Sequence, residues 1–182
     1  MSDASFDPGP LADVRVEASG EQWTLVFVRE LRHPPETVWA ALTDPGQLAA
    51  WSPFTADRDL GTTGDATLTM IDDDAHEDLP VVVVVADPPN VLQHTWDTDV
   101  LRWELTAIAS GTRLTLRHTL QDRTSVPKAA AGWHLCLVVA ERLLDGKPIK
   151  PIVGSKAKDF GWEELERGYG ATLGIASTGW PL

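Results

Sequence analysis

The chain has 182 residues, with 27 acidic residues against 15 basic ones and a formal net charge of −12. A chain of this length can bury a core in one domain without disulfides or metals, and its charge repels nucleic-acid phosphates and anionic lipid heads. With a single cysteine, no leader of basic and then apolar residues, and no apolar run long enough for a membrane span, the sequence predicts a soluble, cytoplasmic protein. We expect neither a nucleic-acid partner nor membrane insertion.

The first part of the chain predicts one strand followed by two short helices. Residues 1–20 show no clear period, and we expect a loose or edge-associated lead-in there. Residues 23–31, WTLVFVREL, are rich in β-branched and aromatic side chains and predict the first strand. Helices are then expected over 36–43 and directly after Asp44, whose side chain can cap the second helix ahead of Pro45.

A long run of strands separated by turn residues follows. The expected strands cover residues 57–60, 66–71, 79–86, 91–96, 100–109 and 111–120. Five successive valines begin at Val81, and this β-branched run favours a strand that is covered on both faces or packed at an edge. Strands joined by such short turns predict an antiparallel meander.

Alternation along three of these strands predicts which side chains face the interior. His94 and Trp96 share one side of their strand, and Trp103 lies on the apolar side of the next strand. Leu116 and His118 share a side of the last strand, opposite its arginines and threonines. The inner face of the sheet is therefore expected to carry two histidines and two tryptophans, unless a bulge inverts the pattern.

The C-terminal part predicts one long apolar helix and one short helix. The long helix covers 127–144, with Thr124 or Ser125 as its cap. The short helix covers 160–169 and ends at Gly170. The expected organisation is a lead-in at 1–20, a single domain at 21–172 and a tail at 173–182.

Four residues of the long helix are candidates to line whatever space the sheet encloses. Trp133 and Leu137 share one face at helical spacing, Cys136 flanks that face, and His134 lies at its border.

The order of these elements resembles the helix-grip fold of the START and Bet v 1-like superfamily. The segments FVRELRHPPETVWAALTDPGQLAAW, LRWELTAIASGTRLTLRHTL and AAGWHLCLVVAERLLDG narrow the resemblance to bacterial SRPBCC proteins of the activator of Hsp90 ATPase homologue 1-like type, over residues 22–170. The resemblance implies an α+β fold in which a curved antiparallel sheet wraps around the long C-terminal helix, with two short helices after the first strand and an apolar cavity between sheet and helix. In that superfamily the cavity binds lipids, hormones, polyketides or other hydrophobic molecules. The family name also refers to a co-chaperone domain that contacts Hsp90, and the family offers no shared catalytic motif.

The residues themselves offer several chemistries, each weaker than a structural role. His94, His118, His134 and Cys136 are zinc-type ligands, but they lie on separate elements without a short ligand pair, so packing or hydrogen bonding accounts for them better. Cys136 could act as a nucleophile beside a histidine, yet its apolar neighbours favour a role as a small hydrophobic residue. The acidic run at 72–78 lacks calcium-loop spacing and is better explained as a solvated turn.

The favoured function is binding of a small hydrophobic or aromatic molecule without defined catalysis. The candidate ligand-binding residues are Trp96, Trp103, Trp133, His94, His118, His134, Leu116, Leu137 and Cys136. No catalytic residue, metal or cofactor is expected. The alternatives are a chaperone-associated interaction module, with a chaperone or a second copy of the chain as partner, and, behind it, a cyclase-like or hydrolase-like enzyme for a hydrophobic substrate.

Overall fold

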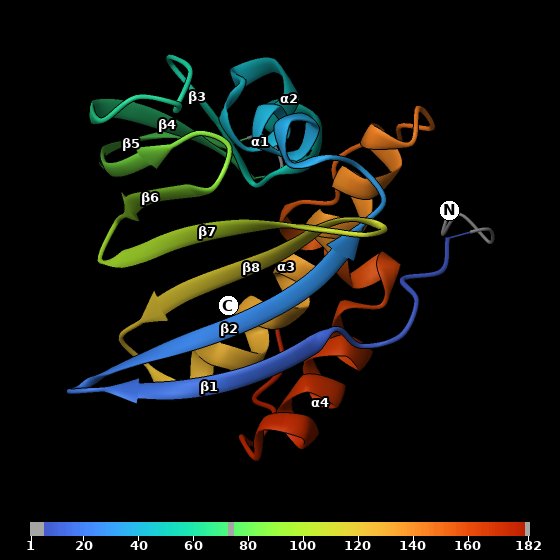
Figure 1. Cartoon of the computed structure of the whole chain (residues 1–182). Coiled ribbons are helices and arrows are strands. Elements are labelled where there is room, and N and C mark those ends of the chain that lie inside the picture. The colour runs from blue at the N-terminus through green and yellow to red at the C-terminus, as the bar shows by residue number, and fades with distance from the viewer. Residues whose placement is uncertain (1–5, 73–74, 181–182) are drawn as a thin grey trace.

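The protein is described by a computed structural model for residues 6–72 and 75–180 (Figure 1). Its strands form one antiparallel sheet in the order β1-β2-β8-β7-β6-β5-β4-β3. They are β1 (Asp13–Ser19), β2 (Gln22–Leu31), β3 (Phe54–Ala56), β4 (Gly64–Asp72), β5 (Ala75–Asp87), β6 (Val91–Trp96), β7 (Asp99–Ile108) and β8 (Gly111–Leu120). Parts of the predicted lead-in, acidic turn and tail, at 1–5, 73–74 and 181–182, lie outside the described residues.

Helices cover one face of this sheet. The helical elements are α1 (Pro35–Thr43), α2 (Pro45–Trp51), the short 3-10 helix η1 (Arg123–Ser125), α3 (Val126–Leu144), the 3-10 helix η2 (Gly154–Phe160) and α4 (Trp162–Leu173). In Figure 1 α3 lies behind β2 and β8, and α4 packs against both α3 and β1. This arrangement confirms the predicted α+β helix-grip fold, with the long helix packed on the sheet and the two short helices after the first predicted strand.

Local sequence explains where the helices begin. Asp44 accepts a hydrogen bond from the backbone N–H of Gln47 at 3.0 Å, so the predicted cap of α2 is confirmed. Pro45 follows as the first helical residue, where a missing N–H costs nothing. Ser125 is the residue before α3, but its side chain makes no capping bond; Asp122 instead caps the preceding turn η1.

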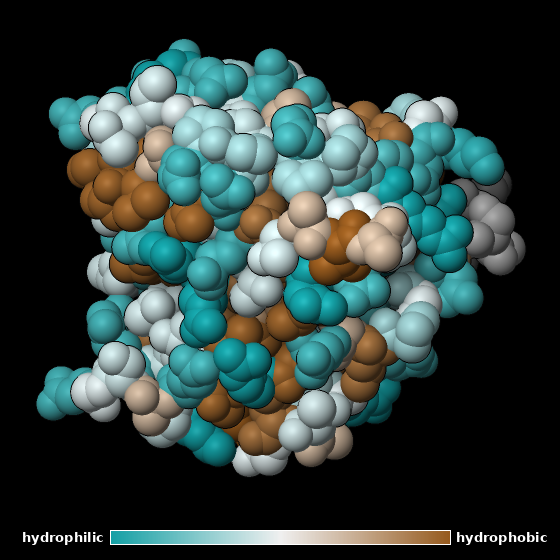
Figure 2. All heavy atoms as spheres, in the orientation of Figure 1, coloured by the Kyte–Doolittle hydropathy of each residue, from teal (hydrophilic) through white to brown (hydrophobic). Residues whose placement is uncertain are grey.

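The pairing register confirms the predicted inner face of the sheet. Trp103 of β7 lies opposite Leu116 of β8, and Leu101 lies opposite His118. All four side chains are buried. Their neighbours in sequence point the other way, so the outer face shown in Figure 2 is largely hydrophilic with apolar patches between the polar residues. On that face Arg117 of β8 pairs with Glu104 of β7 at 2.7 Å and with Glu17 of β1 at 3.3 Å.

The lead-in is edge-associated, one of the two arrangements expected for it, and contains a regular strand, β1, which pairs with β2 as the sheet edge. Two expectations about strands need correction. No strand occupies residues 57–60; the short edge strand β3 lies at 54–56 instead. The valine run is not covered on both faces, because Val81 and Val83 are buried while Val82 and Val84 are 41% and 48% exposed.

The final helix also differs from the expectation. α4 continues through Gly170 and ends at Leu173, with Gly174 in the left-handed conformation that favours glycine. Gly170 is buried within α4. The position requires glycine, because a Cβ there would lie 2.6 Å from the carbonyl oxygen of Ile175. Within the described part of the chain, the helices lack the combination of length and apolar character that crossing a membrane requires.

Candidate functional site

A cavity with a volume of about 420 Å³ lies between the sheet, α3 and the C-terminal segments. One wall comes from the adjoining ends of β6, β7 and β8, which contribute Trp96, Asp99 and His118. The second wall is formed by Ser125 at the end of η1 and by the first half of α3, from Lys128 to Cys136. The connector after α3, η2, the start of α4 and Trp180 complete the lining. Most of the lining is apolar, which is typical of sites for small hydrophobic molecules.

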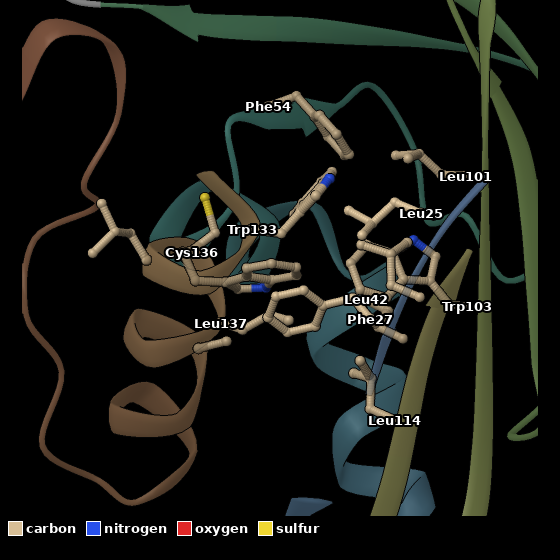
Figure 3. Close-up of a cluster of buried hydrophobic side chains, with 14 of the residues drawn as sticks. Leu25, Phe27, Leu42, Phe54, Leu101, Trp103, Leu114, Trp133, Cys136 and Leu137 are labelled. Atoms are coloured by element: carbon tan, nitrogen blue, oxygen red, sulfur yellow. The ribbon is translucent and has the colours of Figure 1, made fainter. Parts of the chain in front are cut away.

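Four tryptophans line this cavity in two pairs. The rings of Trp96 and Trp133 lie 5.8 Å apart, and those of Trp162 and Trp180 lie 4.7 Å apart at a steep angle. Trp133 reaches deeper as well, because its ring also meets Trp103 edge-on at 5.3 Å. In Figure 3 Trp133 extends from α3 toward the sheet, among the buried residues of the core. Flat aromatic surfaces therefore line the cavity from the sheet and α3 and from the C-terminal segments.

The polar side of the cavity is a chain of three residues. The indole N–H of Trp133 donates to Nδ1 of His118 at 3.0 Å, and Nε2 of His118 lies 2.8 Å from a carboxylate oxygen of Asp99. Because an indole nitrogen can only donate, Nδ1 of His118 must accept and therefore carries no proton. His118 is then the neutral tautomer with its proton on Nε2, which donates to Asp99.

The structure brings four of the predicted site residues to this cavity. Trp96, Trp133, His118 and Cys136 all line it. The remaining five, Trp103, Leu116, Leu137, His94 and His134, are buried elsewhere.

Two of these five, Trp103 and His94, pack against other aromatic rings in the core. Trp103 lies edge-on to Trp51 at 6.0 Å between ring centroids. His94 packs its ring against Phe54, and its Nδ1 lies 2.8 Å from the carbonyl oxygen of Thr95. Burial lowers the pKa of His94, a change that the hydrogen bond to Thr95 opposes. His94 is thus a satisfied core histidine.

His134 lies on the other side of α3. Its Nδ1 is 2.6 Å from the hydroxyl of Tyr169 on α4, and its Nε2 is 2.7 Å from the carbonyl oxygen of Pro8. The same hydroxyl accepts from the backbone N–H of Ala12 at 2.9 Å. His134 therefore ties the N-terminal segment to α3 and α4 and has no contact with the cavity.

The reactivity expected of Cys136 is low. Burial raises the pKa of its thiol to about 12, so little nucleophilic thiolate forms near neutral pH. Across residues 6–72 and 75–180, the structure contains no group of three or more His, Cys, Asp or Glu side chains placed to hold a metal ion.

Several cavity residues escaped prediction because their signal is weak in sequence. Ile152 and Ala157 come from the connector and η2, which have no period that marks an inner face. Trp180 lies in the predicted tail, although its size was a signal that it packs against something. In the sequence Asp99 looks like an ordinary turn residue before the strand predicted at 100–109, and only its pairing with His118 in the structure reveals its place.

Comparison with known proteins gives a consistent result for the fold. The model of the family described as "Activator of Hsp90 ATPase homolog 1-like protein" matches residues 32–144. The conserved protein of unknown function EF2215 from Enterococcus faecalis has a similar structure, with a TM-score of 0.66 and 19% identity over 87% of this chain and 89% of that one.

Two other solved structures are similar at comparable identity. The protein encoded by gene BPP1335 of Bordetella parapertussis has a TM-score of 0.63 and 20% identity over 94% of this chain and 96% of that one. The AHSA1-like protein from Aeromonas hydrophila has a TM-score of 0.57 and 19% identity, covering 68% and 92% of the two chains. At such identities these likenesses concern the fold alone, and the search of curated proteins found no match.

The matched segment runs from the residue after β2 to the last residue of α3 and covers more than half of the chain. It includes both short helices, most of the sheet and the helix that carries Trp133. The chain therefore belongs to the Activator of Hsp90 ATPase homolog 1-like family.

Proposed function

We propose that this protein binds a small hydrophobic or aromatic molecule in the cavity between β6, β7, β8 and α3. The observation that carries the proposal is an apolar space of about 420 Å³ with tryptophans on two sides. An apolar molecule that enters such a space displaces water from its apolar lining, which favours binding. We also propose that the protein is cytoplasmic. Its only cysteine is free and buried, which is typical of proteins from a reducing compartment.

Gly132 offers a direct test of the cavity. It lies on α3 in the cavity lining, and a Cβ added there would have no atom within 4 Å. Gly132→Leu should therefore fill the space from the helix side without a backbone clash. Replacing a helical glycine also improves helix propensity by about 0.8 kcal/mol, so the variant should stay folded.

The experiment is a fluorescence titration with N-phenyl-1-naphthylamine, a neutral aromatic dye that brightens in apolar surroundings. We expect the native protein to bind the dye and Gly132→Leu to bind about tenfold more weakly. Gly132→Ala is the matched control, because it makes the same helical change while adding only one methyl group, and it should bind nearly as well as the native protein.

Two results would contradict the proposal. One is absence of dye binding by the folded native protein. The other is equal binding by the native protein and Gly132→Leu. Either result would favour the interaction-module alternative, in which a protein partner contacts the surface.

A further inference from the structure

The cavity border carries a negative charge that its immediate partner does not neutralise. His118 accepts the Trp133 indole N–H and is therefore neutral, so its hydrogen bond to Asp99 leaves the carboxylate charge in place. Among the described residues no lysine or arginine forms an ion pair with Asp99. The Asp99 side chain is 23% exposed, so the charge is partly withdrawn from water. A carboxylate with limited access to water and no basic partner attracts a cation that enters the cavity.

Two tryptophans line the same cavity as this carboxylate. Trp96 and Trp133 line the same cavity as Asp99, and the Trp96 ring also lies 5.5 Å from the ring of His118. The faces of indole rings attract cations, and this attraction grows when the cation is desolvated. A carboxylate beside two tryptophans therefore combines ion pairing with cation–π contact.

A second cavity extends the negative region. It has a volume of about 320 Å³ and shares Trp96 and Asp99 with the first cavity. Glu77 and Asp97 also line it, and no lysine or arginine does. A ligand that enters past this side meets acidic groups before it reaches the tryptophans, which favours cations during approach.

One basic residue also lines the main cavity. Lys128 lines the cavity from the first turn of α3. Asp122 lies close enough to feel its charge: the Asp122 pKa is lowered chiefly by hydrogen bonds from Thr124 and, to a smaller extent, by Lys128. The positive charge of Lys128 thus also acts on Asp122, whereas Asp99 has no basic side chain as an ion-pair partner among the described residues.

We infer that the molecule bound in this cavity carries a cationic group, such as a protonated amine, next to an aromatic or apolar body. The inference rests on the proposed function, because it assigns a chemical class to the ligand of the same site. Asp99 is the ion-pair partner, Trp96 and Trp133 contact the cation and the ring, and His118 holds the Asp99 carboxylate in place.

Three small probes of similar size and different charge test this inference. They are 2-phenylethylamine, which is cationic at neutral pH, 2-phenylethanol, which is neutral, and phenylacetate, which is anionic. Binding is measured by titration calorimetry or by protein NMR shifts at low ionic strength. The native protein should bind the amine about tenfold more tightly than the alcohol, and phenylacetate most weakly.

The variant Asp99→Asn isolates the carboxylate. Asparagine can still accept the hydrogen bond from His118, so its amide keeps the local geometry while the charge is lost. We expect the preference for the amine over the alcohol to disappear, while affinity for 2-phenylethanol stays near that of the native protein. Retained binding of the alcohol also shows that the variant is folded.

Asp97→Asn is the matched control. Asp97 is exposed, has a φ of 54° that asparagine tolerates well, and lines only the second cavity. It should keep most of the preference for the amine, because it removes the same charge without touching the main cavity.

The possible failures are distinguishable. If none of the three probes binds and the dye also fails, both the proposed function and this inference are wrong. If the alcohol binds as tightly as the amine, the cavity is a binding site but the inference about charge is wrong. Equal loss of preference in Asp97→Asn and Asp99→Asn would also overturn it, because the effect would then come from the overall negative field.

Discussion

The single N–H of the Trp133 indole sets the protonation pattern of the cavity. Because it donates to Nδ1 of His118, the imidazole proton must lie on Nε2, next to Asp99. A histidine in a cavity is often taken as an acid, a base or a metal ligand. Here both ring nitrogens are engaged by protein groups, so His118 positions Asp99 rather than presenting a free nitrogen to a ligand.

The tautomer of His118 is directly measurable. At neutral pH, nitrogen-15 NMR should show a pyridine-like Nδ1 and a pyrrole-like Nε2 for this residue. Trp133→Phe should remove the Nδ1 partner and destabilise the protein by about 2 kcal/mol, since it deletes a buried hydrogen bond and leaves part of the indole space empty. A spectrum with the proton on Nδ1 of the native protein would contradict the hydrogen-bond chain.

Cys136 should react slowly despite lying on the cavity lining. The raised pKa of its thiol, about 12, keeps the thiolate fraction very small near neutral pH. A thiol reagent such as dithionitrobenzoate should modify the folded protein much more slowly than the urea-unfolded protein, where the thiol has an ordinary pKa. Equal rates in the two states, measured by absorbance, would show that Cys136 is an accessible and activated thiol.

At the scale of the elements, the hairpin between β7 and β8 depends on a glycine. Gly111 has a φ of 142°, and a Cβ there would lie 2.2 Å from the carbonyl oxygen of Leu31 and 2.7 Å from the nitrogen of His33. Both atoms are backbone, so no side-chain rotation relieves the contact. The hairpin therefore packs its turn directly against the chain that leaves β2.

Gly111→Ala should for this reason destabilise the protein by about 3 kcal/mol, through backbone strain and the shift of the β2 end. Gly132→Ala is a suitable comparison, because it adds the same methyl group in open space and should be neutral or slightly stabilising. Urea unfolding followed by circular dichroism measures both. A loss at Gly111 as small as the change at Gly132 would contradict the close backbone approach.

Elements with a strong local pattern could be predicted from sequence, and those fixed by tertiary contacts could not. Strands β6 and β8 were predicted with their observed bounds, because alternation and turn residues mark both ends. The strand β1 has only Val14 and Val16 as half-buried apolar positions, too short an alternation to stand out. The strand β3 has three residues, and its existence depends on pairing with β4 rather than on its own composition.

At the scale of the whole molecule, the cavity is made by segments that come together only in the fold. The sheet and α3 supply residues that period-two and helical spacing predicted, namely Trp96, His118, Trp133 and Cys136. The closing wall includes η2 and Trp180, where no period reveals a facing side, and Trp162 of α4, whose helical spacing marks an apolar face but not the cavity that the face borders. The prediction that His134 lines the cavity was wrong for a related reason. Helical spacing put His134 at the border of the inner face, but its side chain contacts Tyr169 of α4 and Pro8 of the N-terminal segment instead.

The burial of His134 between α4 and the N-terminal segment makes the stability of the protein depend on pH. His134 is fully buried between Tyr169 and Pro8, and burial lowers its pKa from 6.5, an effect that the bond to Pro8 opposes and the nearby Arg29 charge supports. The native state therefore holds His134 neutral at pH values where the unfolded chain already binds a proton. Since the unfolded state then binds more protons, stability is full above the unfolded pKa of 6.5 and falls as the pH drops below it toward the lower folded pKa. His94, whose pKa is also lowered by burial, adds to the same trend.

The free energy of unfolding in urea should accordingly decrease as the pH is lowered from slightly alkaline to mildly acidic values. His134→Gln should be less stable at every pH, because a buried network loses a partner, but its stability should change less over this range. The double variant His94→Gln, His134→Gln should have a still flatter profile. If His134→Gln kept the full slope of the native protein, the pH dependence would have to arise from other groups, and the network that joins Pro8, α3 and α4 would not be held by a neutral imidazole.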